Sequence, residues 1–241
     1  MEQMEMESSE SNYYITHKKK MMKFFKIITK KSTNTINTKF NDKLDAPIMD
    51  DIEMEYEKLL PHIPYIGRIE PWTKQLLLTT IFLAVYKKLS TLGNSAEEAW
   101  EVCNTIMKVQ LNSIPRLVRK IIKRSVFSKK QMRTYKRQSL ISQDRFYPQG
   151  DVFDFIEGDN KSYDYGIDII ECAKVKFLKE QQAMEFMPYV CLIDKLWAEI
   201  FEYSLIRKGT IADGCDICDF RLRKDGPVKV ESPVWKNELS N

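Results

Sequence analysis

The fold class is decided by the stretch Asp151-Val-Phe-Asp-Phe-Ile-Glu157 and by Tyr163-Asp-Tyr-Gly-Ile-Asp-Ile-Ile170, which follows it after a short linker. The second stretch alternates from Tyr163 to Ile169, which is the period of a β-strand with one buried face. A linker of five residues, Gly-Asp-Asn-Lys-Ser, favours an antiparallel hairpin. The apolar positions are Tyr163, Tyr165, Ile167 and Ile169, and they alternate with Asp164, Gly166 and Asp168.

Before this hairpin the apolar period is 3.6 residues, which predicts helices. We expect helices at about Asp50–Leu60, ended by Pro61, and at Trp72–Leu89, the core helix. Ser95-x-x-Glu98 is a capping box that opens a further helix. Ser113 and Pro115 then begin a helix whose buried stripe is predicted to be Ile114, Leu117, Val118, Ile121 and Ile122.

After the hairpin we expect helices from Cys172 to about Met184 and from Pro188 to Phe201, then strands at about Tyr203–Ala212 and Ile217–Arg223. The order in the C-terminal half is therefore β-β-α-α-β-β. The predicted fold class is α+β, with an N-terminal helical layer packed on a small antiparallel sheet.

The same patterns suggest how the chain is organised. Residues 1–45 are expected to be weakly ordered or to form a docking segment. Residues 46–241 are expected to form a single α+β domain, with a helical part at 46–140, a sheet-containing part at 146–224 and a tail at 225–241.

Composition narrows the class of protein. Apolar residues make up 43% and charged residues 30% of the 241 residues, which is typical of a globular domain. The longest apolar run, Leu76–Tyr86, is too short to span a bilayer, so no membrane partner is expected. The N-terminus lacks the apolar segment of a secretory signal, which predicts a cytoplasmic protein with reduced cysteines.

A block of basic residues at 116–137 lies within a stretch, Val102 to Gln143, that has no Asp or Glu. Such a block invites a nucleic-acid interpretation, but Gly-rich loops and interleaved aromatic residues are missing from it. We favour a solvated or acid-facing surface and expect no nucleic-acid partner.

Cys215 and Cys218 form a CxxC motif. A zinc site needs a second Cys or His pair, and His17 and His62 are far away in the sequence. A redox site needs a strand-to-helix junction, whereas this pair lies at a predicted hairpin. The sequence therefore predicts no metal and no cofactor.

Several segments together resemble the L-2-amino-thiazoline-4-carboxylic acid hydrolase family. The resemblance covers about residues 50–224, and Cys215 departs from it because the family pattern has Gly there. The segments are Tyr56-Glu-Lys-Leu-Leu-Pro-His-Ile-Pro-Tyr-Ile-Gly67, Ser142-Gln-Asp-Arg145 with Tyr147-Pro148, Tyr163-Asp-Tyr-Gly-Ile-Asp-Ile-Ile-Glu-Cys172, Pro188-Tyr-Val-Cys-Leu-Ile-Asp194, and Arg207-Lys-Gly-Thr-Ile-Ala212 with Gly214 and Cys218-Asp-Phe-Arg221.

The resemblance implies a small-molecule substrate, a cyclic isothiourea with a carboxylate, whose ring is opened by hydrolysis. Water or a protein nucleophile adds to C2, the thiolate leaves, and N-carbamoyl-cysteine remains. Such a site needs a cation for the carboxylate, an anion for the isothiouronium and a base for water.

Candidates for these roles lie in the resembling segments. The expected catalytic residues are Glu171, Cys172, Cys218 and Asp219. The expected substrate-binding residues are Arg145, Asp168, Cys191, Asp194 and Arg221, with the two arginines as carboxylate forks.

Each candidate also has a purely structural explanation. Cys218 can be a small core residue, Asp219 with Arg221 can be a surface ion pair, and Glu171 can serve the dipole of the following helix. Cys218 and Asp219 are expected on opposite faces of one strand. The alternative function is a small-ligand-binding or sensory module of the same fold without the chemistry.

Overall fold

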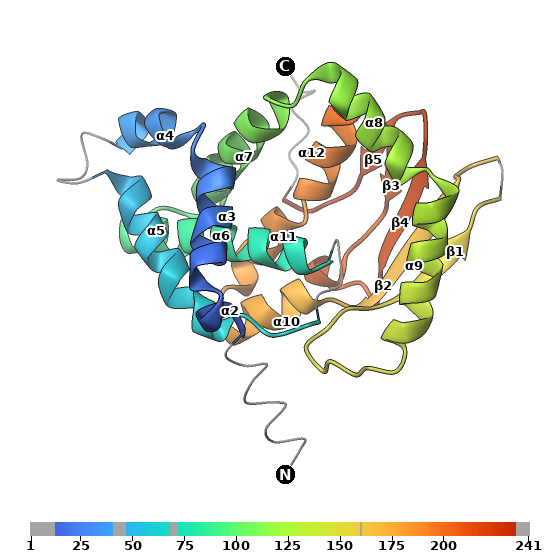
Figure 1. Ribbon diagram of the computed structural model, residues 1–241, viewed down its shortest axis with the longest axis horizontal. Coiled ribbons are helices and arrows are strands. Elements are labelled where there is room, and N and C mark those ends of the chain that lie inside the picture. Colours follow the sequence, from blue (N-terminus) through green and yellow to red (C-terminus); the bar gives the residue numbers. More distant parts are fainter. Residues whose placement is uncertain (1–12, 41–46, 68–71, 160, 235–241) are drawn as a thin grey trace, which may run out of the picture. The chain divides into compact units, whose positions relative to one another are not determined.

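The computed structural model describes residues 13–40, 47–67, 72–159 and 161–234. The chain forms two compact units: unit 1 ends at Ser113 and unit 2 begins at Ile114 (Figure 1). No helix within the described ranges is long and apolar enough to cross a membrane.

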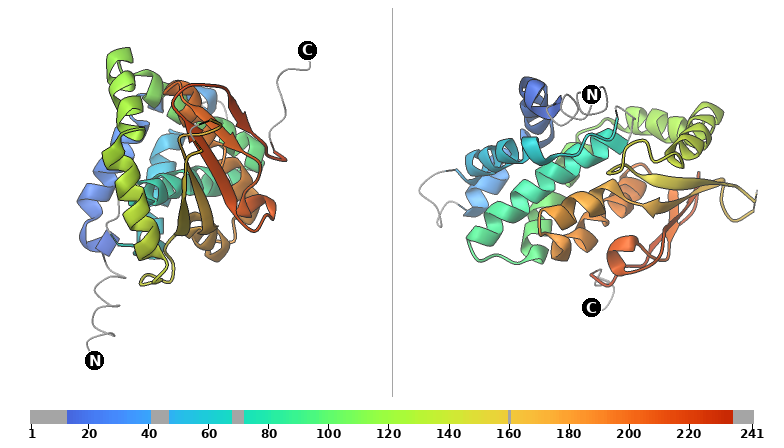
Figure 2. Two further views of the ribbon diagram at one scale, coloured as in Figure 1. Left: turned by 90° about the vertical axis from the view of Figure 1, so that its right-hand side faces the viewer. Right: turned by 90° about the horizontal axis from the view of Figure 1, so that it is seen from below.

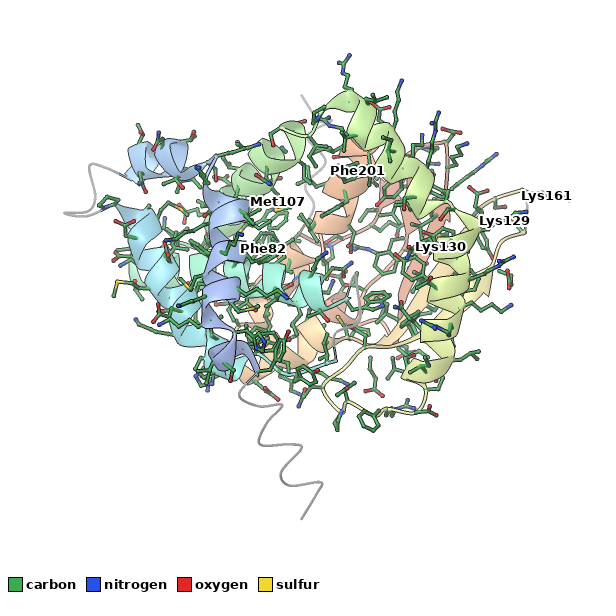
Figure 3. All side chains as sticks on the ribbon, in the orientation of Figure 1. Phe82, Met107, Lys129, Lys130, Lys161 and Phe201 are labelled. Atoms are coloured by element: carbon green, nitrogen blue, oxygen red, sulfur yellow. The ribbon has the colours of Figure 1, made fainter. Side chains whose placement is uncertain are left out.

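In its described residues, unit 1 has helices joined by turns and loops, and no strand. Its longest helix is α6, and most of that helix is buried, so the predicted core helix is confirmed. Figure 3 labels Phe82 on α6 and Met107 on α7, and both side chains belong to the core. The helices are α2 (Tyr13–Thr16), α3 (Lys18–Thr29), α4 (Thr33–Phe40), α5 (Ile48–Leu59), α6 (Trp72–Thr91) and α7 (Ala96–Asn112), with the 3-10 turn η2 (Leu60–His62).

The predicted capping box opens α7. The Ser95 hydroxyl accepts a hydrogen bond from the Glu98 backbone N–H at 3.2 Å, and the Glu98 carboxylate accepts one from the Ser95 N–H at 2.7 Å. Two of the four orphan donors at the helix start are thereby satisfied.

Residues 13–40 are helical and contribute Tyr14, Met21 and Phe25 to the buried residues of unit 1. The Tyr14 hydroxyl donates to the Pro64 carbonyl at 3.5 Å. The rest of the predicted N-terminal segment, residues 1–12 and 41–45, lies outside the described residues. The single-domain boundary at residue 46 stays a prediction.

Unit 2 contains a five-stranded sheet in the order β1-β2-β4-β3-β5, which confirms the α+β class. Phe155 lies opposite Ile167 in the antiparallel β1–β2 pair, so the predicted hairpin is confirmed. The strands are β1 (Val152–Glu157), β2 (Tyr165–Glu171), β3 (Ser204–Arg207), β4 (Cys218–Arg223) and β5 (Val228–Val230).

The prediction of a purely antiparallel sheet is wrong. β5 lies in the predicted tail and pairs parallel with β3, Leu205 opposite Val228, which makes the sheet mixed. β3 also ends at Arg207, earlier than predicted, and the chain then forms the 3-10 turn η4 (Ile211–Asp213). Three residues, Val-Lys-Val, are too few to give a periodic signal.

Two helices begin unit 2: α8 (Arg116–Val126) and α9 (Lys129–Ser142). The Ser139 and Ser142 hydroxyls accept hydrogen bonds from the backbone N–H groups of Phe155 and Phe153 at 3.1 and 3.2 Å. α9 therefore lies along the free edge of β1, as Figure 2 shows, and protects its backbone groups.

The predicted buried stripe of α8 is wrong. α8 has no buried residue, and Leu117 and Ile121 are 72% and 56% exposed. An apolar stripe shows that a helix is amphipathic, but it does not specify which surface covers it.

The segment between β2 and β3 is α10 (Ala173–Glu180), η3 (Met184–Phe186), α11 (Met187–Val190) and α12 (Ile193–Ile200). The second predicted helix is thus interrupted at Cys191 and Leu192. Ala198 of α12 packs with Leu205 and Val230. We call the face of the sheet that packs against α12 the helix-covered face. It also carries Tyr165, Ile167, Ile169, Cys218, Phe220, Leu222 and Arg207. The opposite, outer face carries Gly166, Asp168, Asp219 and Arg221.

Candidate functional site

A buried arginine marks the helix-covered face of the sheet. Arg207 is the last residue of β3, two positions after the buried Leu205, so the two side chains lie on the same face of the sheet. It is 0% exposed. Its guanidinium lies over the Phe220 ring, 5.6 Å from the ring centroid.

One nitrogen of this guanidinium is fully engaged. Nη1 donates to the Asp194 carboxylate and to the Cys191 carbonyl, each at 2.8 Å. Asp194 lies in the first turn of α12, and Cys191 lies at the break between α11 and α12. Nε and Nη2 are buried and have no hydrogen-bond partner among the described residues.

The junction between β2 and α10 adds a thiol and an amine to this region. Cys172 and Lys174 are 5% and 8% exposed. Burial by itself lowers the pKa of Lys174, but electrostatic interactions with nearby acidic groups, led by the Asp194 carboxylate, outweigh it, so that pKa is raised. Lys174 therefore carries its ammonium charge at neutral pH.

Cys218, the first residue of β4, lies in the same region. Its sulfur accepts a hydrogen bond from the Ile211 N–H at 3.2 Å. Cys172, Lys174 and Asp194 all act electrostatically on its thiol. We call the set Cys172, Lys174, Cys191, Asp194, Arg207 and Cys218 the inner cluster.

The three thiols of the inner cluster are neutral at physiological pH. Burial raises the pKa of Cys191 and of Cys172, against the opposing charge of Lys174. Burial also raises the pKa of Cys218 to about 12. A thiol that acts as a nucleophile here must therefore lose its proton to a base during the reaction.

Three further candidates lie on the outer face of the sheet, away from the inner cluster. Arg221 donates to both carboxylate oxygens of Asp168, through Nη1 at 2.5 Å and Nη2 at 3.2 Å, and lies over the Tyr163 ring. Asp219 accepts the backbone N–H groups of Lys208 and Gly209, both at 2.9 Å, and so fixes the chain just after Arg207. These three side chains already have partners within the fold.

Arg145 and Glu171 form a third group. Their ion pair has a length of 2.8 Å, and Lys176 also donates to Glu171, at 2.5 Å. These two hydrogen bonds lower the pKa of Glu171. The Arg145 side chain is 51% exposed, so this pair is a surface feature.

The structure thus brings together four of the nine predicted site residues, Cys172, Cys191, Asp194 and Cys218, and leaves five elsewhere. Sequence reasoning missed Arg207 and Lys174. Arg207 lies in one of the segments that resemble the family. Its spacing of two residues from Leu205 could have revealed it, because this spacing places both side chains on the same face of the strand and a charged residue is rare in a core.

The CxxC motif divides between two environments. Cys215 is exposed, whereas Cys218 is buried in the inner cluster. Over the described ranges, no group of three or more His, Cys, Asp or Glu side chains is arranged to hold a metal ion.

The basic block lies on α8 and α9, where Lys129 and Lys130 are exposed (Figure 3). Two of its lysines are paired with acids: Lys123 with Asp225 at 2.8 Å and Lys136 with Glu157 at 2.5 Å. These contacts fit an acid-facing surface, and the expectation of no nucleic-acid partner stays a prediction.

Comparisons with known proteins gave one match. A model described as L-2-amino-thiazoline-4-carboxylic acid hydrolase matches residues 75–222, more than half of the chain and a range that holds the whole inner cluster. No curated protein and no solved structure matches. The chain belongs to the L-2-amino-thiazoline-4-carboxylic acid hydrolase family.

Proposed function

We propose that this protein is a hydrolase that opens the ring of 2-amino-thiazoline-4-carboxylate or a closely related cyclic isothiourea, and that the inner cluster is its site. The observation that carries the proposal is the convergence of three thiols, a carboxylate and two cations in one buried region of unit 2. Family membership supplies the substrate class.

The reaction adds one water and breaks one ring bond. A nucleophile, either water or one of the three thiols, attacks C2 while its proton passes to the Asp194 carboxylate. The C2–S bond breaks, and the departing sulfur takes a proton. With water as the nucleophile, the product is N-carbamoyl-cysteine at once.

A thiol nucleophile requires a second step. The enzyme sulfur is then bonded to C2 after ring opening, and a water molecule displaces it to form the urea carbonyl. The Lys174 ammonium stabilises negative charge on sulfur in either route, because a buried cation acts strongly on a nearby developing anion.

Turnover is best followed by mass spectrometry, as substrate plus one water. A thiol reagent would also react with Cys215, which is exposed. A folded wild-type chain that forms no product from several related rings contradicts the proposal. Stabilisation by these rings without any product instead supports the ligand-binding alternative.

Single alanine variants identify the nucleophile. Replacement of Cys172, Cys191 and Cys218 in turn should abolish turnover at one position only if a thiol attacks C2. Cys215→Ala is the matched control, and we expect it to keep wild-type turnover. Full activity in all three variants would assign the attack to water.

A further inference from the structure

The orientation of Arg207 carries an inference about what the site binds. A guanidinium presents five N–H donors in one plane, and Nε–H runs parallel to one Nη2–H along a single edge. Nε–H and both N–H groups of Nη2 lack partners among the described residues, and this parallel pair is among them, whereas Nη1, on the far side, is held by Asp194 and Cys191. The parallel pair therefore forms one intact side-on fork.

Buried polar groups in native proteins nearly always have hydrogen-bond partners. Two adjacent unpaired donors on a side chain that is 0% exposed therefore indicate a missing partner with two acceptor atoms at matching spacing. A carboxylate meets this requirement, because its two oxygens accept both donors of a side-on fork in parallel.

The surroundings of the guanidinium restrict how that partner approaches. The guanidinium carbon lies over the Phe220 ring. The Asp194 carboxylate occupies the Nη1 edge. The two contacts of Nη1 do not use the Nε–Nη2 edge, so a carboxylate bound at that edge would leave both of them in place.

We propose that the Nε–Nη2 edge of Arg207 is the carboxylate subsite of this protein, and that it selects cyclic substrates bearing a carboxylate over the same rings without one. This places the recognition of the substrate's carboxylate on Arg207 instead of Arg145 or Arg221, whose guanidinium groups already bind Glu171 and Asp168. The inference rests on the proposed function only for the identity of the ring.

The first test uses the wild-type chain and three ligands: 2-amino-thiazoline-4-carboxylate, its carboxamide, and the ring without the carboxyl group. Binding is measured by calorimetry and turnover by mass spectrometry. We expect the carboxylate to bind about 100-fold more tightly than either other ligand, the range of a bidentate, charge-assisted contact. Equal affinities would mean that the fork holds only ordered water, and would overturn the subsite.

The second test uses Arg207→Lys, which keeps the charge but has no side-on fork. We expect the preference for carboxylate over carboxamide to fall to about 10-fold or less. The matched control is Arg137→Lys, at an exposed arginine of α9, and it should keep the wild-type preference. An unchanged preference in folded Arg207→Lys would refute the assignment; if that variant does not fold, the wild-type ligand series decides alone.

The subsite and the hydrolase proposal can fail separately. Carboxylate-selective binding without product supports the subsite and refutes the chemistry. Equal binding and equal turnover of all three rings supports the chemistry and refutes the subsite.

Discussion

Removing the Asp194 carboxylate should destabilise unit 2 strongly, because its partner Arg207 is fully buried. Asp194→Ala removes the only carboxylate that hydrogen-bonds Arg207 within the described residues, while the guanidinium stays buried at 0% exposure. Breaking a buried ion pair by removing one partner costs about 3–5 kcal/mol, because it leaves an uncompensated charge. The Asp194 side chain is 20% exposed, which favours the lower end of that range.

Urea unfolding followed by circular dichroism measures this cost. A typical dependence of about 1–3 kcal/mol per molar urea converts a loss of about 3 kcal/mol into a midpoint shift of about 1–3 M. Asp194→Asn should cost less than Asp194→Ala, since the amide oxygen can still accept from Nη1.

The matched control is Glu157→Ala. Its ion pair with Lys136 has side chains that are 70% and 60% exposed, and such pairs contribute about 0–1 kcal/mol. A free energy of unfolding for Asp194→Ala within about 1 kcal/mol of the wild type would refute the reasoning that Arg207 depends on this buried pair.

Two further outcomes follow from the structure. Burial raises the pKa of four thiols (Cys103, Cys172, Cys191 and Cys218) above the ordinary thiol value of 9.0, so the folded state holds protons that the unfolded chain releases. The thiols should therefore leave the free energy of unfolding unchanged below pH 9 and lower it above pH 9 by about 1.4 kcal/mol per pH unit for each such thiol. A free energy of unfolding that stays constant up to pH 11 would contradict this prediction. Cys215→Ser is the control and should not change the pH dependence. Ser95→Ala removes the N-cap of α7 and should lower the free energy of unfolding by about 1 kcal/mol in urea titrations. Ser90→Ala, at an exposed position of α6, should not destabilise, and equal effects at the two serines would argue against the capping interpretation.

Local signals account for the elements that the sequence predicted well. The alternation of residues 163–169 and the short linker before them identify the β1–β2 hairpin, because a strand with one buried face must alternate. Ser95 and Glu98 identify the start of α7, because both capping contacts lie within one turn. The apolar residues of 72–89 identify the core helix α6.

The candidate site was predicted only in part, for a physical reason. Alternation separates Cys218 from Asp219, but both faces of β4 have plausible catalytic residues, and the sequence alone does not say which face the helices cover. Packing of α12 against β3 and β5 decides that Cys218 is buried in the inner cluster, whereas Asp219 anchors a loop on the outer face.

The sequence by itself determined the secondary structure near strong periodic signals, the family resemblance and four of the residues that meet in the inner cluster. Tertiary structure alone decided the parallel pairing of β5, the exposure of α8 and the burial of Arg207. These features depend on contacts between segments far apart in the chain, and no local pattern encodes which surface covers an amphipathic helix or which of several arginines loses its contact with water.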